Sequence, residues 1–243
     1  TRRFSDLPGG HFEDVVAYGG WKLDDHHPDA FESKTHSSVE YECPSPFGIP
    51  FDCLYSVNVP NLMFAGRDIS ATHMSFSATR VMATCAMMGQ AVGTAASMLV
   101  KYNIDPAELR RERIAELQTT LEDDDCMLPF RWRKVSPLTA EARCDDDVAI
   151  LKNGIDRDYA GADNGVWTDA GEEKIVYSWD ASRRISGARL VFDSKMTFTG
   201  KRMRKLEATV TPAKMPEMLA KGFRIDARVC GEWKTVFSDD CNF

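Results

Sequence analysis

The segment from Pro60 to Val100 constrains the fold of this chain more than any other stretch. It opens with a short apolar run, Leu62 to Ala65, that stops at Gly66 and gives way to a polar turn. An apolar run that ends at a glycine before a turn is typical of a buried strand leaving a sheet. The segment therefore predicts a strand that ends at Gly66.

The second half of this segment predicts a long helix. From Val81 onward nearly every residue is small or apolar, and Gly89 and Gly93 stand four positions apart. A helix that is apolar nearly all round is buried, and its glycines let another backbone come close. Polar residues interrupt the apolar run at Arg80, Thr84, Gln90, Thr94 and Ser97. Too few uninterrupted apolar residues remain for a membrane span, so we expect none.

The turn between the predicted strand and helix concentrates polar side chains. Residues 67–80 include Arg67, Asp68, Ser70, Thr72, His73, Ser75, Ser77, Thr79 and Arg80. The exposed amides of a helix N-terminus and the positive end of its dipole favour an anionic or electron-rich oxygen. The sequence therefore predicts a binding site just ahead of the long helix.

Several motifs resemble one family. The letters AGRDISATH, followed by TRVMATCAMMGQAVGTAA, resemble the C-terminal flavin-contacting segment of FAD-dependent oxidoreductases, which reads roughly AGRxISATHxAxxxxRVMxTCxxMGQAAGTAA. Upstream, TRRF, DVVAYGGW and LDDHHP resemble the family's ExRRI, DAIAxGGW and IDxHxP. The resemblance implies an α/β fold, namely part of a Rossmann-like FAD-binding domain of the glutathione-reductase type over residues 1–135.

The resemblance also implies FAD as the cofactor. It places these residues at the flavin: Gly66, Arg67, Asp68, Val81, Met82, Ala83 and Thr84. The backbone at 81–84 would face the pyrimidine end of the isoalloxazine, where fixed dipoles stabilise the negative charge of a reduced flavin. Family members often carry Cys where this chain has Asp68.

His73 and Arg80 are the predicted catalytic residues. A histidine with nearby hydroxyls can move a proton alongside a hydride, and an arginine can hold an anionic or carbonyl oxygen, which also makes Arg80 a substrate-binding candidate. A second interpretation is structural: His73 bonds a loop carbonyl and Arg80 pairs with a carboxylate. A serine hydrolase using Ser75 or Ser77 is a third idea, but the chain has no G-x-S-x-G elbow.

Trp21 and His27 are the further substrate-binding candidates, because their motifs lie on the flavin and substrate side in the family. We align His27 with the family histidine, and His26 is the competing choice. Other candidates of second rank are Arg2, Arg3 and Asp25.

The run from Asp24 to His27 also invites a metal interpretation. Adjacent residues on an extended chain point to opposite faces, and no second cluster supplies more ligands, so we expect no metal site.

A second helix is predicted over 107–121. Asp105 is a suitable N-cap, Pro106 suits the first helical position, and Glu108 completes a capping box. We expect its charged residues, Arg110 among them, to face water. Upstream, GIPFDCL resembles the family's IPYRCL with Asp52 in place of Arg, which either alters substrate preference or marks a position that faces solvent.

From residue 136 the pattern becomes β-like. Short runs between turn signals predict strands at 148–151, 174–179, 188–192, 206–210, 223–229 and 234–237. Such spacing indicates an all-β antiparallel sandwich, and the letters WTDAGEEKIVYSWDASRRISGARLVFD resemble galactose-binding-like sandwiches of the discoidin type.

The predicted sandwich offers one sugar-binding hypothesis. Trp167 could stack on a sugar face while Asp163, Asn164 or Arg157 bonds its hydroxyls. The alternative is that Trp167 anchors a core or an interface. We expect Trp179 and Trp233 to lie in the core.

Composition and missing motifs limit the remaining possibilities. The net charge of −7 argues against a nucleic-acid partner, and the seven cysteines form no C-x-x-C pair. The fingerprint G-x-G-x-x-G, which cradles the FAD pyrophosphate, does not occur in the chain. We therefore expect a piece of a longer flavoenzyme that lacks its N-terminal FAD-binding segment and holds FAD weakly or not at all.

Two functions follow from these patterns. The first is an FAD-dependent oxidoreductase that transfers a hydride between FAD and a small organic substrate, for which a carbohydrate is one candidate. The second is a non-catalytic module that binds a glycan or a partner through the C-terminal sandwich.

Overall fold

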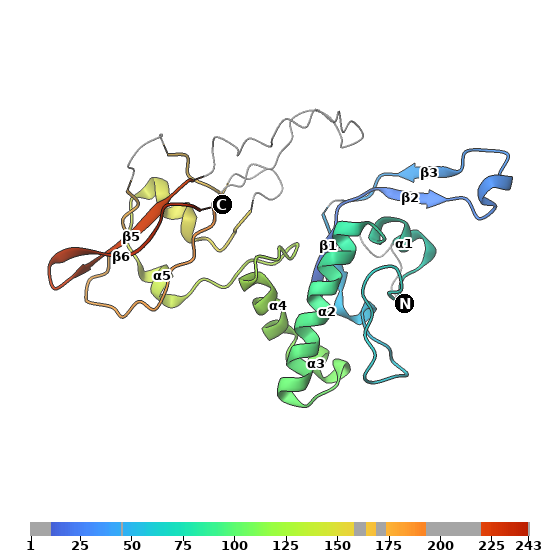
Figure 1. Cartoon of the computed structure of the whole chain (residues 1–243), viewed down its shortest axis with the longest axis horizontal. Coiled ribbons are helices and arrows are strands. Elements are labelled where there is room, and N and C mark those ends of the chain that lie inside the picture. Colours follow the sequence, from blue (N-terminus) through green and yellow to red (C-terminus); the bar gives the residue numbers. More distant parts are fainter. Residues whose placement is uncertain (1–10, 45, 158–163, 169–173, 193–219, 243) are drawn as a thin grey trace. The chain divides into compact units, whose positions relative to one another are not determined.

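A computed structural model of the chain describes residues 11–44, 46–157, 164–168, 174–192 and 220–242 (Figure 1). The chain divides into two compact units. The first comprises Thr1–Val166 and Ala170–Tyr177, and the second comprises Trp167–Asp169 and Ser178–Phe243. Every helix that the structure describes belongs to the first unit. The candidates Arg2, Arg3 and Asp163 lie outside the described residues.

Two antiparallel ribbons form the N-terminal part of the first unit. Strand β1 (Val15–Gly19) pairs with β4 (Phe47–Pro50), and β2 (Leu23–His26) pairs with β3 (Ser38–Tyr41). A Cβ atom on Gly19 would lie 2.4 Å from Cζ of Phe47, so only glycine fits there. The close backbone approach expected at this glycine pair is confirmed for Gly19.

Short 3-10 turns follow β2 and β4. Helix η2 (Ala30–Glu32) lies in the connection between β2 and β3, and η3 (Phe51–Cys53) directly follows β4.

The long helix α2 (Met82–Tyr102) supplies the core of the first unit. Its buried side chains are Thr84, Met88, Ala91, Ala95 and Met98. They recur every three to four positions, which puts them on one face. This face packs against β1 and against helices α3 (Pro106–Glu112) and α4 (Ile114–Asp123). The helix ends at Asn103, which takes the left-handed conformation with φ 53°.

The opposite face of α2 is exposed, so the prediction of a helix buried on all sides is wrong. Met82 is 88% exposed, and a Cβ atom on Gly89 or Gly93 would meet no atom of the described residues within 4 Å. These two glycines lie away from the core, and no other segment of the described chain approaches them.

In the part of the chain that the structure describes, α2 is the one helix long and apolar enough to cross a membrane. Core helices of globular proteins share that property, and α2 contributes its buried face to the core of the first unit.

The predicted strand at 62–65 does not form a ladder. Met63 makes a single antiparallel bridge to Tyr55, and Leu62 is exposed. The expected Rossmann-like sheet is therefore not seen, because the strands described in this unit pair only as antiparallel ribbons. The first unit still combines helices with strands, in line with an α/β class.

The capping box at Asp105 and Glu108 is confirmed. The side chain of Asp105 accepts from the Glu108 amide, and that of Glu108 accepts from the Asp105 amide. The predicted single helix over 107–121 is instead two helices, because the backbone breaks at Arg113, with φ −136°.

A buried ion cluster joins three segments of the first unit. Asp14 precedes β1 and is fully buried, and the Nε atom of Arg110 from α3 lies 3.1 Å from its Oδ2. The same Nε lies 3.3 Å from Oδ1 of Asp52 in η3. Arg110 therefore does not simply face water, so that expectation is corrected. The side chain of Asp52 is 34% exposed, and its effect on substrate preference stays a prediction.

Tyr55 completes this cluster. Its hydroxyl donates to Oδ1 of Asp52 at 3.1 Å. Burial, reinforced by the charge of Asp52, raises the pKa of Tyr55 to about 12. The phenol therefore stays protonated and remains a donor to the carboxylate.

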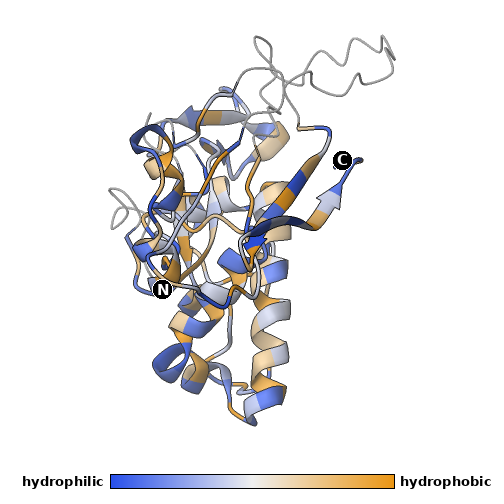
Figure 2. Cartoon of the chain, turned by 90° about the vertical axis from the view of Figure 1, so that its left-hand side faces the viewer, coloured by the Kyte–Doolittle hydropathy of each residue, from blue (hydrophilic) through white to orange (hydrophobic). Residues whose placement is uncertain are grey.

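The C-terminal elements only partly match the predicted sandwich. Residues 148–151 lie in a 3-10 helix, η4 (Asp146–Lys152), which follows α5 (Pro137–Glu141). The hairpin of β5 (Phe223–Val229) and β6 (Glu232–Asp239) is confirmed, and Figure 2 shows hydrophilic and hydrophobic residues alternating along it near the C-terminus.

The remaining strands of the sandwich are not found where the structure describes the chain. Residues 174–179 and 188–192 form no strand, and residues 206–210 lie outside the described ranges. Trp233 is 61% exposed, so its prediction as a core residue is wrong. Trp179 is half-buried.

Replacing Arg110 with Met should destabilise the chain by about 3–5 kcal/mol, because it leaves the buried Asp14 carboxylate without its cation. The neighbouring Arg111 is exposed and pairs with Glu112, so Arg111→Met should change the free energy of unfolding by less than about 0.5 kcal/mol. Urea denaturation of both variants measures the difference. Equal stabilities would contradict a structural role for the cluster.

Candidate functional site

The polar turn folds into a short helix, α1 (His73–Thr79), directly before α2. Its N-cap is Thr72, whose side-chain oxygen accepts from the Ser75 amide at 3.3 Å. Its C-cap is Arg80, and Val81 alone separates Arg80 from the first residue of α2. His73 therefore begins α1 and Arg80 ends it, just ahead of the long helix.

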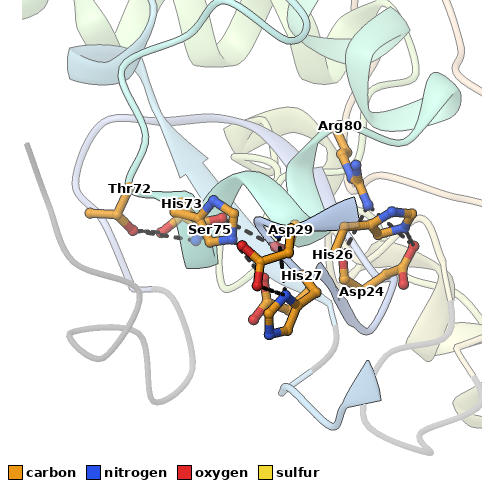
Figure 3. A network of polar contacts seen from close by, with 10 residues as sticks. Asp24, His26, His27, Asp29, Thr72, His73, Ser75 and Arg80 are labelled. Carbon is orange, nitrogen blue, oxygen red and sulfur yellow. Dashed lines mark hydrogen bonds and ion pairs between the residues drawn. The ribbon is translucent and has the colours of Figure 1, made fainter. Parts of the chain in front are cut away.

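Two neighbouring carboxylates on β2 contact these two residues (Figure 3). Oδ1 of Asp25 lies 2.6 Å from Nε2 of His73. A terminal nitrogen of Arg80 donates to the Asp24 carbonyl at 2.9 Å and to Oδ2 of Asp24 at 3.2 Å. Side chains of adjacent strand residues point to opposite faces, which lets one dipeptide reach both ends of α1.

The histidines that follow take different partners. Nε2 of His26 lies 3.0 Å from Oδ2 of Asp24, so His26 joins the Arg80 cluster. His27 contacts Asp29 within its own loop, with 3.6 Å between Nδ1 and Oδ2. The structure thus brings His26, the alternative choice, to the carboxylate that pairs with Arg80, whereas His27 pairs with Asp29 (Figure 3).

Trp21 lies at the start of this segment and is exposed. Its backbone carbonyl accepts from the Cys43 thiol at 3.1 Å. Burial raises the pKa of the Cys43 thiol, so that group is a weak donor and not a ready nucleophile. The indole of Trp21 remains accessible to a ligand.

The contacts bear on the alternative interpretations of the turn. His73 bonds a carboxylate and not a loop carbonyl, whereas Arg80 does pair with a carboxylate. The hydroxyl of Ser77 donates to the His73 carbonyl, and that of Ser75 bonds Thr72. Among the contacts of the described residues, neither serine hydroxyl bonds the His73 ring, so the geometry does not support a serine nucleophile.

The first turn of α2 is open. Its N-cap residue, Val81, supplies no side-chain hydrogen bond, and Met82 and Ala83 are exposed, while Thr84 is buried. The amides of such a first turn have no partner within the helix. They present donors and the positive end of the dipole of a 21-residue helix to a ligand.

The turn at 66–68 lies close to the α2 N-terminus. Gly66 has φ +102°, a conformation that only glycine adopts without strain, and a Cβ atom on Gly66 would lie 3.9 Å from both Cβ and Sγ of Cys85 in α2. Arg67 and Asp68 are exposed on this turn. Burial raises the pKa of the Cys85 thiol despite the nearby Arg67 charge.

Two guanidinium groups share one ring beside this turn. The Cζ atom of Arg67 lies 5.4 Å from the Phe76 ring centroid, and that of Arg80 lies 5.7 Å from it. Cations at this range interact with the face of an aromatic ring, which orders both side chains. The positive charge near the α2 N-terminus adds to the helix dipole and favours an anionic group.

Residues 5–121 match the model of the FAD dependent oxidoreductase family. The matched segment contains the turn at 66–68, both predicted catalytic residues and the first turn of α2. It identifies flavin-linked redox chemistry as the class of function, and FAD as the cofactor. No curated protein and no solved structure matches this chain.

The residues present fit the ring end of a flavin. Met82 and Ala83 in the first turn of α2 are exposed, Val81 supplies no side-chain cap, and Arg67 and Arg80 add positive charge. A reduced flavin carries negative charge on its pyrimidine edge, which such donors stabilise. Among the described residues, no group of three or more His, Cys, Asp or Glu side chains is arranged to hold a metal ion.

Sequence reasoning missed Asp24 and ranked Asp25 second. Both lie in the DDHH run, which the sequence shows as four adjacent polar residues without partners. Their partners lie 56 and 48 positions away. The alternation of strand side chains indicates that neighbours face different partners, and that signal could have separated Asp24 from Asp25.

The predicted sugar-binding residues are engaged elsewhere. Arg157 pairs with Asp125 at 2.6 Å, and the side chain of Asn164 accepts from that of Asn153 at 3.1 Å. Trp167 belongs to the second unit and is 66% exposed, so it is not a core residue. Its sugar-stacking role stays a prediction.

A hollow in the first unit is lined by residues of 122–133 and 154–157. Glu122, near the end of α4, is its buried acid, and Nε of Arg131 lies 2.9 Å from its Oε1. Burial raises the pKa of the Glu122 carboxyl, although Arg131 acts in the opposite direction. Arg133 pairs with Asp156 at 2.8 Å on the same hollow, so its charges are largely matched by neighbours.

Replacing Glu122 with Gln should remove the free-energy cost of ionising a buried carboxyl group, which depends on pH. The folded state keeps the Glu122 proton above the ordinary pKa of 4.5, so the stability from this group is full below that value and declines as the pH rises through the folded-state pKa. The stability of Glu122→Gln relative to the unaltered chain should therefore increase from pH 4 to pH 8, by on the order of 1 kcal/mol.

Thermal unfolding across this pH range measures the effect. Glu112→Gln, at an exposed surface position, serves as the control and should alter stability at neutral pH by less than about 0.5 kcal/mol. A relative stability of Glu122→Gln that falls with rising pH would show that the Arg131 pair outweighs burial.

Proposed function

We propose that this chain forms the flavin-ring and substrate-facing part of an FAD-dependent oxidoreductase that oxidises an alcohol or reduces the corresponding carbonyl. The observation that supports the proposal is the exposed, uncapped first turn of α2, which directly follows a helix bounded by His73 and Arg80. Donors for a flavin and groups for a substrate thus come from one continuous segment.

When bound, FAD supplies the hydride acceptor or donor. The amides of Met82, Ala83 and Thr84 would hold the electron-rich edge of its ring, with Val81 leading into that turn. Gly66, Arg67 and Asp68 would contact its ribityl and phosphate region. These assignments come from the family resemblance together with the open first turn of α2.

The residues of the chain would manage the proton and the substrate oxygen. Oxidation of a C–OH group to C=O removes a hydride from carbon and a proton from oxygen, and both electrons leave with the hydride. We assign the proton to His73, which is exposed and bonded to Asp25. Arg80 would hold the substrate oxygen through the guanidinium nitrogens that Asp24 does not use.

The substrate would approach over the exposed residues of the N-terminal ribbon. Trp21 offers an apolar face and His27 a polar one. A carbohydrate, which carries many alcohol groups, is one substrate of this chemistry, and the exposed Trp167 supports it only as a candidate stacking residue.

The proposal predicts that Ala83→Glu weakens flavin binding at least tenfold, which corresponds to about 1.4 kcal/mol. The new carboxylate would occupy the first turn of α2 and repel the negative charge of the flavin. An acidic residue at this place stabilises the helix itself, so the variant should fold. Quenching of FAD fluorescence on titration with the chain measures the affinity.

Ser97→Glu provides the matched control, because Ser97 is an exposed residue of the same helix far from its N-terminus. It should bind FAD as the unaltered chain does. Equal affinities of Ala83→Glu and Ser97→Glu for FAD would overturn the proposed function.

A further inference from the structure

We propose that Asp25 is a positioning residue that holds His73 in the tautomer with hydrogen on Nε2, so that Nδ1 is the nitrogen that exchanges a proton with the substrate. The inference deepens the proposed function and rests on it, because it assigns the atom through which His73 would act. It concerns residues of this chain alone.

Asp25 and His73 are joined by a short hydrogen bond. Nε2 of His73 lies 2.6 Å from Oδ1 of Asp25, a distance at the short end for a nitrogen donor and a charged acceptor. An ionised carboxylate only accepts hydrogen bonds, so the hydrogen must be on Nε2. In the neutral imidazole the lone pair is then on Nδ1.

The other ring nitrogen of His73, Nδ1, belongs to an exposed side chain. The side chain of His73 is 64% exposed, and the residues that the structure describes make no hydrogen bond to Nδ1. A proton acceptor must reach its substrate within hydrogen-bond distance. Nδ1 is therefore the ring nitrogen left open to a substrate, whereas Nε2 is bonded to Asp25.

Asp25 lies on a β-strand and His73 on an α-helix. Asp25 stands opposite Val39 in the antiparallel pairing of β2 and β3. His73 is the first residue of α1, whose start is fixed by the Thr72 cap. A partly exposed ion pair adds little to stability, so the effect of this bond is on the orientation of the ring.

Asp24, the neighbour of Asp25 on β2, positions the other predicted catalytic residue, Arg80. Asp24 receives the Arg80 guanidinium on the same strand, so β2 sets the positions of the proton-exchanging group and of the cation together (Figure 3). The His27–Asp29 contact differs in kind, since it joins neighbours in one loop at 3.6 Å. That contact offers a matched control.

Two-bond proton–nitrogen NMR of the chain labelled with ¹⁵N-histidine tests the inference without any ligand. In the unaltered chain, His73 should show a protonated Nε2, an unprotonated Nδ1, and a downfield proton resonance from the Nε2–H···Asp25 bond. The variant Asp25→Asn should lose the downfield resonance. Asp29→Asn should retain it, and His73→Gln should abolish it, which assigns the signal.

A hydrogen on Nδ1 of His73 in the unaltered chain, or a downfield resonance that persists in Asp25→Asn, would overturn the inference. The protonation state of Nδ1 is measured in the unaltered chain, so the test stays decisive even if Asp25→Asn fails to fold. The spectra are recorded without flavin. Equal affinities of Ala83→Glu and Ser97→Glu for FAD would overturn the proposed function but would leave the tautomer result unchanged, so the two failures are distinguishable.

Discussion

The contact between two adjacent carboxylates of β2 and the two ends of α1 is the constraint on which the candidate site depends. Asp25 holds His73 at the start of α1, and Asp24 holds Arg80 at its end. Only Val81 separates Arg80 from α2, so fixing this end of α1 also fixes the direction in which the first turn of α2 points. The amides that we assign to the flavin and the side chains that we assign to the substrate are therefore positioned by one strand.

Stability and function have different sources in the first unit. Partly exposed ion pairs such as Asp25–His73 contribute little free energy. The buried face of α2 against β1, and the buried contact of Asp14 with Arg110, hold the unit together. This division lets the site stay open to a ligand, because the residues that bind are not the ones on which folding depends.

Local signals in the sequence predicted local structure well. The capping box at Asp105 and the two strands of the C-terminal hairpin each depend on residues a few positions apart, and each is confirmed. The strand at 62–65 did not form, and among the described residues the sandwich is confirmed only as far as its C-terminal hairpin, because an apolar run forms a strand only where a partner strand exists. In a helix whose residues are small or apolar nearly all round, the sequence likewise does not indicate which face will pack against the core.

The same limit applies to the site. His73 and Arg80 were predictable, because they crowd into one turn beside a recognisable helix. Their partners on β2 lie about fifty positions upstream, and only the folded ribbon brings them together. Arg110 shows the converse error: its charged neighbours suggested a solvated face, whereas the buried Asp14 draws it inward.

Backbone amide NMR during titration with flavin mononucleotide tests the central claim most directly, because this flavin carries the redox ring and one phosphate. If the first turn of α2 faces the flavin, the largest shifts will fall on Met82, Ala83 and Thr84, with smaller ones at Gly66 and Arg67. Shifts confined to the hollow around Glu122, or no shifts at the α2 N-terminus at saturating flavin, would contradict the account.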